Sequence, residues 1–350
     1  MHIGVAIPSF RGQSMIAETL ASVLEQSHTD WTCVVVNDAQ EDGTREVVER
    51  LGDRRIHYIC DGRRRGQLAN FNRAILEVLK YDPAIIRLLS ADDVLYPHAF
   101  ADIVRLFGMF PNLGLVATYF DVIDESGRIL ARVDMKGRTD RVISGREYLW
   151  KGAAVGNTIG GPSSVALRRE VIETAGLFDT RLNYAGDREL WHRIAAQWHI
   201  GWIGMRSGFQ YRRHAESVTV RDRFSASRFT DKIRSIRLIA ATEAMFGWRW
   251  WIHQYTIGWL HAINVQMLAI MAVRREWSGF RTGLRVSLRE GIVVYAPFWL
   301  GRLPVQIVRA VIGRDPSARL IWRSVHESFQ PPMVAVGSSK DGDEEETLPG

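Results

Sequence analysis

The chain has few cysteines and lacks both of the common glycine-rich phosphate-binding motifs. Only Cys33 and Cys60 among its 350 residues are cysteines, and they do not have the spacing of a metal site. This usage suits a reducing compartment and argues against a disulfide framework. No Gly-x-Gly-x-x-Gly follows the first predicted strand and no Gly-x-x-x-x-Gly-Lys-Ser/Thr occurs, which argues against dinucleotide and P-loop sites. No basic segment followed by an apolar stretch opens the chain, so we expect no secretory signal.

Positive charge is concentrated in the C-terminal third. The formal net charge is +6, but residues 221–323 contain 17 Lys and Arg against 6 Asp and Glu, a balance of +11, and an acidic run follows at 341–346. A basic segment of this kind predicts an anionic partner, either nucleic acid or membrane phosphate. Because no nucleic-acid-reading motif accompanies the charge, we expect a membrane surface and no nucleic acid.

The first half of the chain alternates short apolar runs with amphipathic segments. Strands are predicted at 2–7, 31–36, 55–59 and 84–89, with helices at 13–26, 43–51 and 66–80 between them. Such alternation predicts a parallel, doubly wound α/β sheet with right-handed crossovers. A hairpin is predicted at 119–123 and 129–133, then strands at 164–167, 201–203 and 209–211, and helices at 170–175 and 188–197.

Beyond Val220 the pattern changes to long helical stretches. They are predicted at 228–246, 248–273 and 277–288, and a further apolar stretch covers 291–312. The composition therefore divides the chain into three regions. We predict an α/β domain over residues 1–222, a basic helical region over 223–330 and a disordered acidic tail over 331–350, whose composition cannot form a core.

Two adjacent carboxylates, Asp92 and Asp93, directly follow the predicted strand at 84–89. Ligands of open α/β sheets bind beyond the carboxyl ends of the strands. Two like charges side by side repel each other unless a cation lies against them, and a divalent cation that carries a phosphate is the usual solution. The alternative is an acidic turn that caps the helix beginning near Pro97.

Polar residues also end the first two predicted strands. Pro8, Ser9 and Arg11 follow the first strand, and Asn37 and Asp38 follow the second. These strand ends lie at the same edge of the predicted sheet as the two carboxylates, which is how an α/β sheet builds a nucleotide site. We expect Asp38 to accept a hydrogen bond from the imide N–H of a nucleobase.

The sequence resembles glycosyltransferase family 2, whose members are inverting enzymes with the GT-A fold. The resemblance covers about residues 1–220. It implies a Rossmann-like α/β fold, with a mostly parallel sheet flanked by helices. The basic region lies outside the resemblance, so we expect it to be a helical C-terminal extension. The blocks that carry the resemblance occur in the family's order and are Pro8 to Arg11, Asn37 to Thr44, Gly66 to Ile75, Ser90 to Pro97, Gly176 to Asp179, Tyr184 to Trp191 and Tyr211 to Val218.

The resemblance implies a chemical role for several of these residues. Asp187 is the implied general base, which takes the proton of an acceptor hydroxyl as it attacks the anomeric carbon. Asp93 and His214 are the implied ligands of Mg²⁺ or Mn²⁺, which bridges the diphosphate of the donor. Contacts to the nucleotide-sugar donor are implied for Pro8, Ser9, Arg11, Asp38 at the nucleobase, Gly66, Asn70, Asp92 at the ribose and Arg212 at the diphosphate.

Several of these assignments have local alternatives. Asp187 has the position of an N-cap for the helix predicted at 188–197, and His214 that of a partly buried loop histidine. Ser90, Asn37 and Gly186 each stand where many relatives carry an acidic residue. The Gln-x-x-Arg-Trp motif of processive synthases is absent, so we expect one sugar to be added per encounter.

The function implied by the resemblance is metal-dependent transfer of a sugar from a nucleotide diphosphate donor, UDP being the expected nucleotide. The acceptor is a saccharide or a lipid-linked saccharide in bacterial surface-polysaccharide synthesis. Two alternatives stay open. A nucleotidyltransferase requires a glycine-rich loop, and Phe10 to Gln13 contains a single glycine. A non-catalytic sugar-nucleotide or membrane-binding protein would have kept the fold without the chemistry.

The basic helical region suggests where the protein works. Residues 250–273 carry no charged side chain and have the length of a bilayer span, yet they include several polar residues. Abundant Trp beside Arg favours helices that lie in the headgroup plane. A helical subdomain packed on the first domain or on a second subunit, and a true spanning helix, are the alternatives. We expect a cytoplasmic protein, peripheral on the inner face of the membrane, that is compatible with a homo-oligomer.

Overall fold

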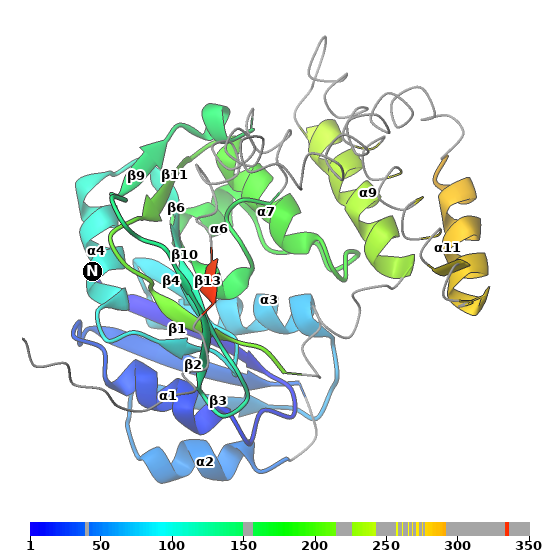
Figure 1. Cartoon of the computed structure of the whole chain (residues 1–350). Helices are drawn as coiled ribbons and strands as arrows, with labels where there is room; N and C mark the ends of the chain where they lie inside the picture. The colour runs from blue at the N-terminus through cyan, green and yellow to red at the C-terminus, as the bar shows by residue number, and fades with distance from the viewer. Residues whose placement is uncertain are drawn as a thin grey trace, which may run out of the picture.

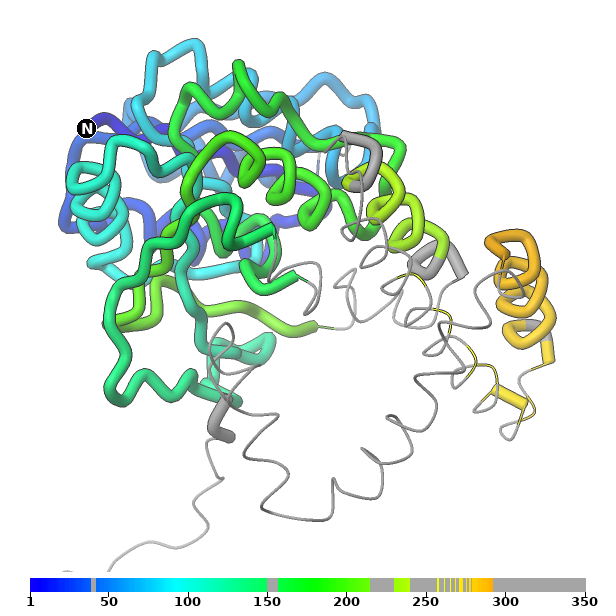
Figure 2. Tube along the Cα trace, turned by 90° about the horizontal axis from the view of Figure 1, so that it is seen from above, coloured from blue at the N-terminus to red at the C-terminus, as the bar shows by residue number. Residues whose placement is uncertain are grey.

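The computed structural model describes residues 1–38, 42–149, 157–214, 226–242, 277–291 and 333–335, together with a few residues between 257 and 275. Figure 1 shows a large central sheet with helices packed around it and the helices α9 and α11 at one side of this body. Figure 2, viewed from above, shows the same two helices at the periphery. The α/β class predicted from the sequence is confirmed.

Four parallel strands form the N-terminal half of the large sheet, in the order β3-β2-β1-β4. The strands are β1 Ile3–Ser9, β2 Trp31–Asn37, β3 Ile56–Cys60 and β4 Ile85–Leu88, and the helices between them are α1 Ile16–Leu24, α2 Thr44–Leu51 and α3 Gln67–Val78, which continues as η1 Leu79–Tyr81. Each predicted element of this half is present, with ends shifted by a few residues. Ser9 pairs with Asn37, so the polar ends of β1 and β2 lie at one edge of the sheet.

The C-terminal half of the sheet is mixed, whereas the N-terminal half, for which the alternation predicts parallel strands, is parallel. Strand β10 Val165–Arg168 runs antiparallel to both β4 and β6 Leu113–Thr118, β11 His199–Ile203 lies parallel to β6, and β9 Arg141–Ile143 closes the edge antiparallel to β11. The chain reaches β10 after an inserted hairpin rather than through a single crossover helix, so the βαβ handedness rule does not fix its direction. The helices of this half are α4 Ala99–Met109, α6 Glu170–Ala175 and α7 Gly186–Ala195.

A smaller sheet contains the predicted hairpin. Its order is β13-β8-β7-β12-β5, with β5 Val94–Leu95, β7 Phe120–Ile123, β8 Ile129–Val133, β12 Phe209–Arg212 and β13 Met333–Ala335. β13 is a correction, because residues 333–335 belong to the tail predicted to be disordered. This short apolar segment pairs antiparallel with β8. Strand β5 begins directly after Asp93, so the small sheet holds that carboxylate from one side.

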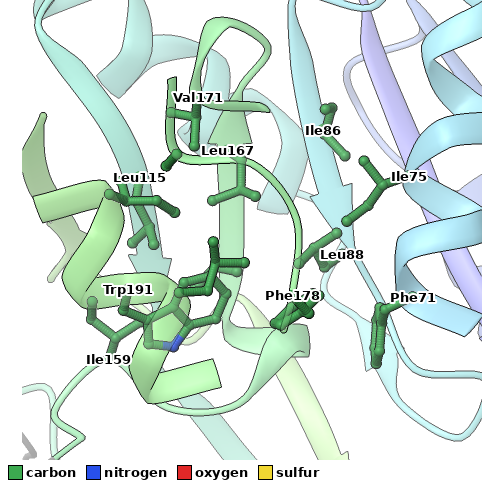
Figure 3. Packing of buried hydrophobic residues seen from close by; sticks show 14 of the residues in the cluster. Phe71, Ile75, Ile86, Leu88, Leu115, Ile159, Leu167, Val171, Phe178 and Trp191 are labelled. Atoms are coloured by element: carbon green, nitrogen blue, oxygen red, sulfur yellow. The ribbon is translucent and has the colours of Figure 1, made fainter. Parts of the chain in front are cut away.

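Alternate residues of the central strands face two hydrophobic clusters. Ala6 of β1 faces the cluster beneath α3 and α7, whereas Val5 faces the cluster beneath α1 and α4. In Figure 3, which shows part of the first cluster, Phe178 lies between Phe71 of α3 and Trp191 of α7. Burial of such side chains contributes about 1.5–3 kcal/mol each. The cluster thereby fixes the start of α7 against the sheet.

Two helices of the basic C-terminal region are described. Helix α9, Ala226–Thr242, packs against α7, and α11, Trp277–Arg289, packs against α9. The predicted stretch at 248–273 is described only at scattered residues, and the stretch at 291–312 lies almost wholly outside the described residues, as does the predicted boundary at residue 222. Among the helices that are described, none has the length and apolarity needed to cross a bilayer.

Candidate active site

One buried amide ties together the polar ends of β1 and β2. Asn70, on α3, donates hydrogen bonds through Nδ2 to the carbonyl oxygens of Ser9 (3.2 Å) and Val36 (3.0 Å). The backbone N–H of Asp38 also donates to the carbonyl of Ser9, at 2.8 Å. The Asn70 amide is thus engaged with the backbone, and it affects any ligand at this edge through the position of the two strand ends.

Asp38 holds the loop that precedes α3. Its two carboxylate oxygens accept the backbone N–H groups of Arg65 (2.7 Å) and Gly66 (2.8 Å). Gly66 has a φ of 91°, in the left-handed region that favours glycine. Each carboxylate oxygen has two lone pairs, so Asp38 keeps acceptor capacity for a further donor.

An exposed aromatic ring with two cations stands at the end of β1. Phe10 is 42% exposed, and the guanidinium carbons of Arg11 and Arg64 lie 5.4 Å and 4.5 Å from its ring centroid. Arg11 belongs to the segment after β1, and Arg64 to the loop that Asp38 holds. Two guanidinium groups side by side favour an anionic ligand at this point.

Asp93 is buried at the end of β4, beside Asp92. Its Oδ1 accepts the backbone N–H of Arg212 at 3.0 Å. Burial, and then the charge of Asp92, raise the pKa of Asp93 well above its usual value, and the hydroxyl of Ser163 opposes the rise. The pair therefore resists carrying two negative charges unless a cation is near.

One such cation lies inside the sheet. Arg87 on β4 is fully buried and donates from Nη1 to the carbonyl oxygens of Leu88 (3.0 Å) and Val165 (2.7 Å). Its Nε and Nη2 have no hydrogen-bond partner in the part of the chain that the structure describes. Burial lowers the pKa of Arg87 to about 9, and Asp93 opposes that shift. Arg87 therefore offsets part of the charge of the two aspartates.

Arg212 is buried at the end of β12, where its guanidinium joins three segments. It donates to the carbonyl oxygen of Asp92 (2.9 Å), to those of Asp124 (3.0 Å) and Glu125 (3.1 Å) in the hairpin turn, and to the Glu18 carboxylate on α1 (2.5 Å). The sequence predicts a diphosphate contact for Arg212. In the structure its side chain instead holds the backbone at Asp92 in place through a hydrogen bond.

The Asp92–Asp93 pair suits a divalent cation that is shared with a ligand. Mg²⁺ is usually bound through one or two carboxylates together with substrate phosphates. No group of three or more His, Cys, Asp or Glu side chains is placed to hold an ion among the residues described. His214 lies beside the pair, with Nε2 2.9 Å from Oδ2 of Asp92. The raised pKa of Asp93 is the feature that fits a cation, because positive charge would relieve the repulsion.

Asp187 lies in the first turn of α7. Its Oδ1 accepts the N–H of Arg188 (2.7 Å) and its Oδ2 accepts Nδ2 of Asn157 (2.8 Å). Burial raises the pKa of Asp187 to about 6, although both hydrogen bonds oppose the shift. A carboxylate with this pKa is ionised at neutral pH and still basic enough to accept a proton.

The segment from Asn157 to Ser164 connects the two carboxylate sites. At one end, Asn157 bonds Asp187 and also donates to the carbonyl of Gly160 at 3.0 Å. At the other end, Ser163 accepts the N–H of Ser90 and donates to its hydroxyl, both at 2.9 Å. A turn and the short helix η2, Pro162–Ser164, lie between these ends. This segment therefore links the surroundings of Asp93 to Asp187 through hydrogen bonds at its two ends.

Residues 4–176 match the family model described as Glycosyl transferase family 2. The chain carries a domain of glycosyl transferase family 2. The GT-A fold inferred from the sequence is confirmed by solved structures. TarS 1–349 of S. aureus in complex with UDP-GlcNAc aligns with a TM-score of 0.52 at 13% identity, covering 83% of this chain and 92% of that one. The mannosyltransferase PcManGT of Pyrobaculum calidifontis, in complex with GDP-Man and Mn²⁺, aligns with a TM-score of 0.51 at 17% identity, covering 89% and 88%.

Curated relatives of this family 2 domain match over shorter segments. An uncharacterized glycosyltransferase of Nostoc sp. is 28% identical over 140 residues, 39% of this chain and 42% of that protein. The putative teichuronic acid biosynthesis glycosyltransferase TuaG of Bacillus subtilis is 33% identical over 75 residues, 21% of this chain and 30% of that protein. The UDP-Glc:alpha-D-GlcNAc-diphosphoundecaprenol beta-1,3-glucosyltransferase WfgD of Escherichia coli is 29% identical over 93 residues, 26% and 35%. The chain thus spans less than half the length of these relatives.

Sequence reasoning missed several residues that build the site of this family 2 domain. Asn157 and Glu18 have no pattern of their own, because their roles depend on contacts between distant segments. Ser163 lies in the Gly-Gly-Pro-Ser stretch at 160–163, whose residues indicate a turn before a strand. Arg87 was detectable, since a lone arginine within an otherwise apolar strand has to find a countercharge.

Proposed function

We propose that this chain is an inverting, metal-dependent and non-processive glycosyltransferase. It moves a sugar from a nucleotide diphosphate donor to a hydroxyl of a saccharide or lipid-linked acceptor. The observation that carries the proposal is the pairing of Asp187, whose pKa is about 6, with the buried Asp93 through the segment 157–164. This arrangement supports a base and a phosphate-binding pair on one side of the sheet. Membership of the family supports the reaction class.

In the proposed reaction, the acceptor hydroxyl attacks the anomeric carbon from the face opposite the diphosphate. The new glycosidic bond forms as the bond to the diphosphate oxygen breaks, and the hydroxyl proton passes to Asp187. Asn157 and the N–H of Arg188 keep the carboxylate aimed while it accepts that proton. A positioned base contributes about 10²–10⁴-fold in rate. Because the displacement is single, the anomeric configuration inverts.

The donor binds, in this proposal, across the ends of β1, β2 and β4. Pro8, Ser9, Arg11 and Gly66 line the nucleotide, Asp38 accepts from the base, and Asp92 holds the ribose. Asp93 and His214 hold Mg²⁺ or Mn²⁺, which when bound neutralises charge on the leaving nucleotide. Given their hydrogen bonds, we assign Asn70 and Arg212 to positioning these groups rather than to contact with the donor.

The names of similar proteins support finer expectations. UDP-GlcNAc is bound in the aligned TarS structure, and the name of WfgD specifies UDP-Glc and a diphosphoundecaprenol acceptor. GDP-Man with Mn²⁺ is bound in the aligned mannosyltransferase. We propose UDP as the nucleotide and a lipid-linked surface-glycan precursor as the acceptor, which places the enzyme on the cytoplasmic face of the membrane.

The test uses purified protein with a panel of UDP-, GDP- and dTDP-sugars, with and without Mn²⁺, and measures release of free nucleotide diphosphate in the presence of acceptor. Asp187→Asn is expected to lower the rate about 100-fold or more. Asp179→Asn is the matched control, because Asp179 forms a surface pair with Arg181 and loses the same charge. Equal rates for wild type and Asp187→Asn would remove Asp187 from the mechanism.

The dependence of kcat/KM on pH below neutrality, the acid limb of the rate profile, provides a second test of Asp187 as the base. Only ionised Asp187 can accept a proton, and its pKa is raised to about 6. The kcat/KM for transfer is therefore expected to rise as the pH passes through about 6 and to level off above it. The limb should be present in Asp179→Asn as well.

A further inference from the structure

The outward face of α11 has an unusual composition for a helix of a globular protein. Trp277, Leu284 and Leu288 are 53%, 38% and 56% exposed. With 3.6 residues per turn, positions 277, 284 and 288 fall on one face of the helix. Exposed apolar side chains gathered on one helix face indicate a surface that is covered when the protein functions.

A row of arginines borders this apolar face. Arg281, Arg285 and Arg289 are spaced four residues apart, so they stack along one side of the helix. All three are exposed, and none forms an ion pair or hydrogen bond among the described residues. Their charges are thus available to an anionic partner.

The opposite face of α11 shows which side of the helix points inward. Small residues Gly279, Gly283 and Ser287 repeat every four positions there, and a Cβ on Gly283 would lie 2.9 Å from Leu268. Glu290, just after the helix, is buried and pairs with Arg237 of α9 at 2.9 Å. The helix is therefore anchored by its small residues, with its Trp, Leu and Arg side chains directed away from the protein.

We infer that α11 docks on an anionic lipid bilayer, with Trp277, Leu284 and Leu288 in the headgroup–acyl boundary and the arginine row on lipid phosphates. Aromatic and leucine side chains flanked by arginines are the composition of helices that lie in the membrane plane. A second copy of this chain is disfavoured as the occupant, because an antiparallel two-fold contact would bring the two arginine rows together, whereas lipid phosphates pair with them. Figures 1 and 2 both show α11 at the outer edge of the molecule, beyond α9, where a flat surface can reach it.

The test is flotation of the full chain with vesicles of phosphatidylcholine, with or without phosphatidylglycerol, and needs neither donor nor acceptor. Wild type is expected to float with the anionic vesicles only. The triple variant Arg281→Gln, Arg285→Gln, Arg289→Gln should partition about 100-fold less, since each arginine at an anionic surface contributes about fivefold. Leu284→Ser with Leu288→Ser should also weaken flotation, because both changes are at exposed positions that leave the anchored face intact.

The matched control is Arg54→Gln, Arg128→Gln, Arg146→Gln, which removes three exposed charges from the α/β body. It should float like wild type if position, rather than net charge, matters. Equal flotation of the α11 triple variant and wild type would overturn the inference. So would a concentration-dependent dimer in sedimentation velocity that is lost with Leu284→Ser and Leu288→Ser, because it would make a second copy the occupant. A transfer assay with a water-soluble acceptor distinguishes failure of membrane docking from failure of the proposed function, because that assay does not depend on the membrane.

Discussion

At the scale of one residue, the partly buried carboxylate of Asp187 lowers stability in exchange for reactivity. Burial raises its pKa from 3.8 to about 6, so the folded state holds the proton more tightly than the unfolded chain. Its contribution to stability is therefore complete below about pH 4 and is lost as the pH rises through about 6. The shift corresponds to about 3 kcal/mol at neutral pH.

Asp187→Asn should reveal this cost, because an amide does not ionise. The variant loses part of the hydrogen bonding with Asn157, which costs about 1 kcal/mol at every pH. Relative to wild type it should gain about 3 kcal/mol between pH 4 and pH 8, and be the more stable protein at pH 8. Urea denaturation of both proteins at the two pH values measures the difference. A gap that does not change with pH would show that Asp187 is not desolvated in the fold.

Individual residues also show how far sequence alone predicted the site. The order of motifs along the chain indicated Asp93 and Asp187, and their roles stay predictions; the structure shows that the segment 157–164 contacts Asp187 at one end and Ser90, near Asp93, at the other. The same motifs assigned Asn70 and Arg212 to the donor, yet their polar atoms are engaged with the backbone. A motif specifies which residue type stands at a position. It does not specify which neighbour satisfies its hydrogen bonds, since that depends on tertiary contacts.

At the scale of the element, α9 holds the start of α7. Asp231 on α9 is 2% exposed, and its Oδ2 accepts the N–H groups of Asn183 (2.6 Å) and Tyr184 (3.0 Å), just before Asp187. Asp231→Ala should loosen this turn and hydrate the base. We expect kcat for transfer to fall about tenfold with little change in the donor KM, by analogy with a lost charge-assisted hydrogen bond.

The pH profile distinguishes positioning from general destabilisation. Better hydration of Asp187 lowers its pKa, so the acid limb in Asp231→Ala should move below about pH 6. Asp231→Asn keeps an acceptor oxygen and should restore most of the rate. Glu173→Gln, an exposed change on α6, serves as the control. If the acid limb of the rate–pH profile in Asp231→Ala stays at the wild-type pH, α9 does not influence the pKa of Asp187.

Element periodicity predicted the N-terminal strands and helices closely because each carries its own apolar pattern. It does not specify strand direction or pairing where these depend on how distant segments meet. Strand β10 runs antiparallel within the sheet, and β13 brings Met333–Ala335 back to β8. The predicted helices at 228–246 and 277–288 correspond to α9 and α11, but no sequence pattern revealed that α11 turns its small residues inward.

At the scale of the whole molecule, the basic helices and the proposed transfer site occupy different parts of the structure. The α/β body carries the proposed transfer site, and α9 and α11, two helices of the basic region, lie to one side of it. Asp231 connects this side to the turn before Asp187, while α11 presents arginines outward. An acceptor delivered from a lipid surface would therefore reach the base from the side on which the basic helices lie.

The dependence of the transfer rate on salt distinguishes the arginines of α11 from Arg11 and Arg64 at the proposed donor site. The Debye length falls from about 10 Å at 0.1 M salt to about 3 Å at 1 M, so exposed arginines on α11 are strongly screened. Transfer to a lipid-linked acceptor in phosphatidylglycerol vesicles should fall about tenfold or more over this range. Transfer to a water-soluble acceptor should change far less, because Asp93 is buried and Asp187 partly buried, so both are less screened than exposed arginines. Rates that fall in parallel for both acceptors would instead place the salt-sensitive charge at the donor site, on Arg11 and Arg64, and would argue against membrane delivery.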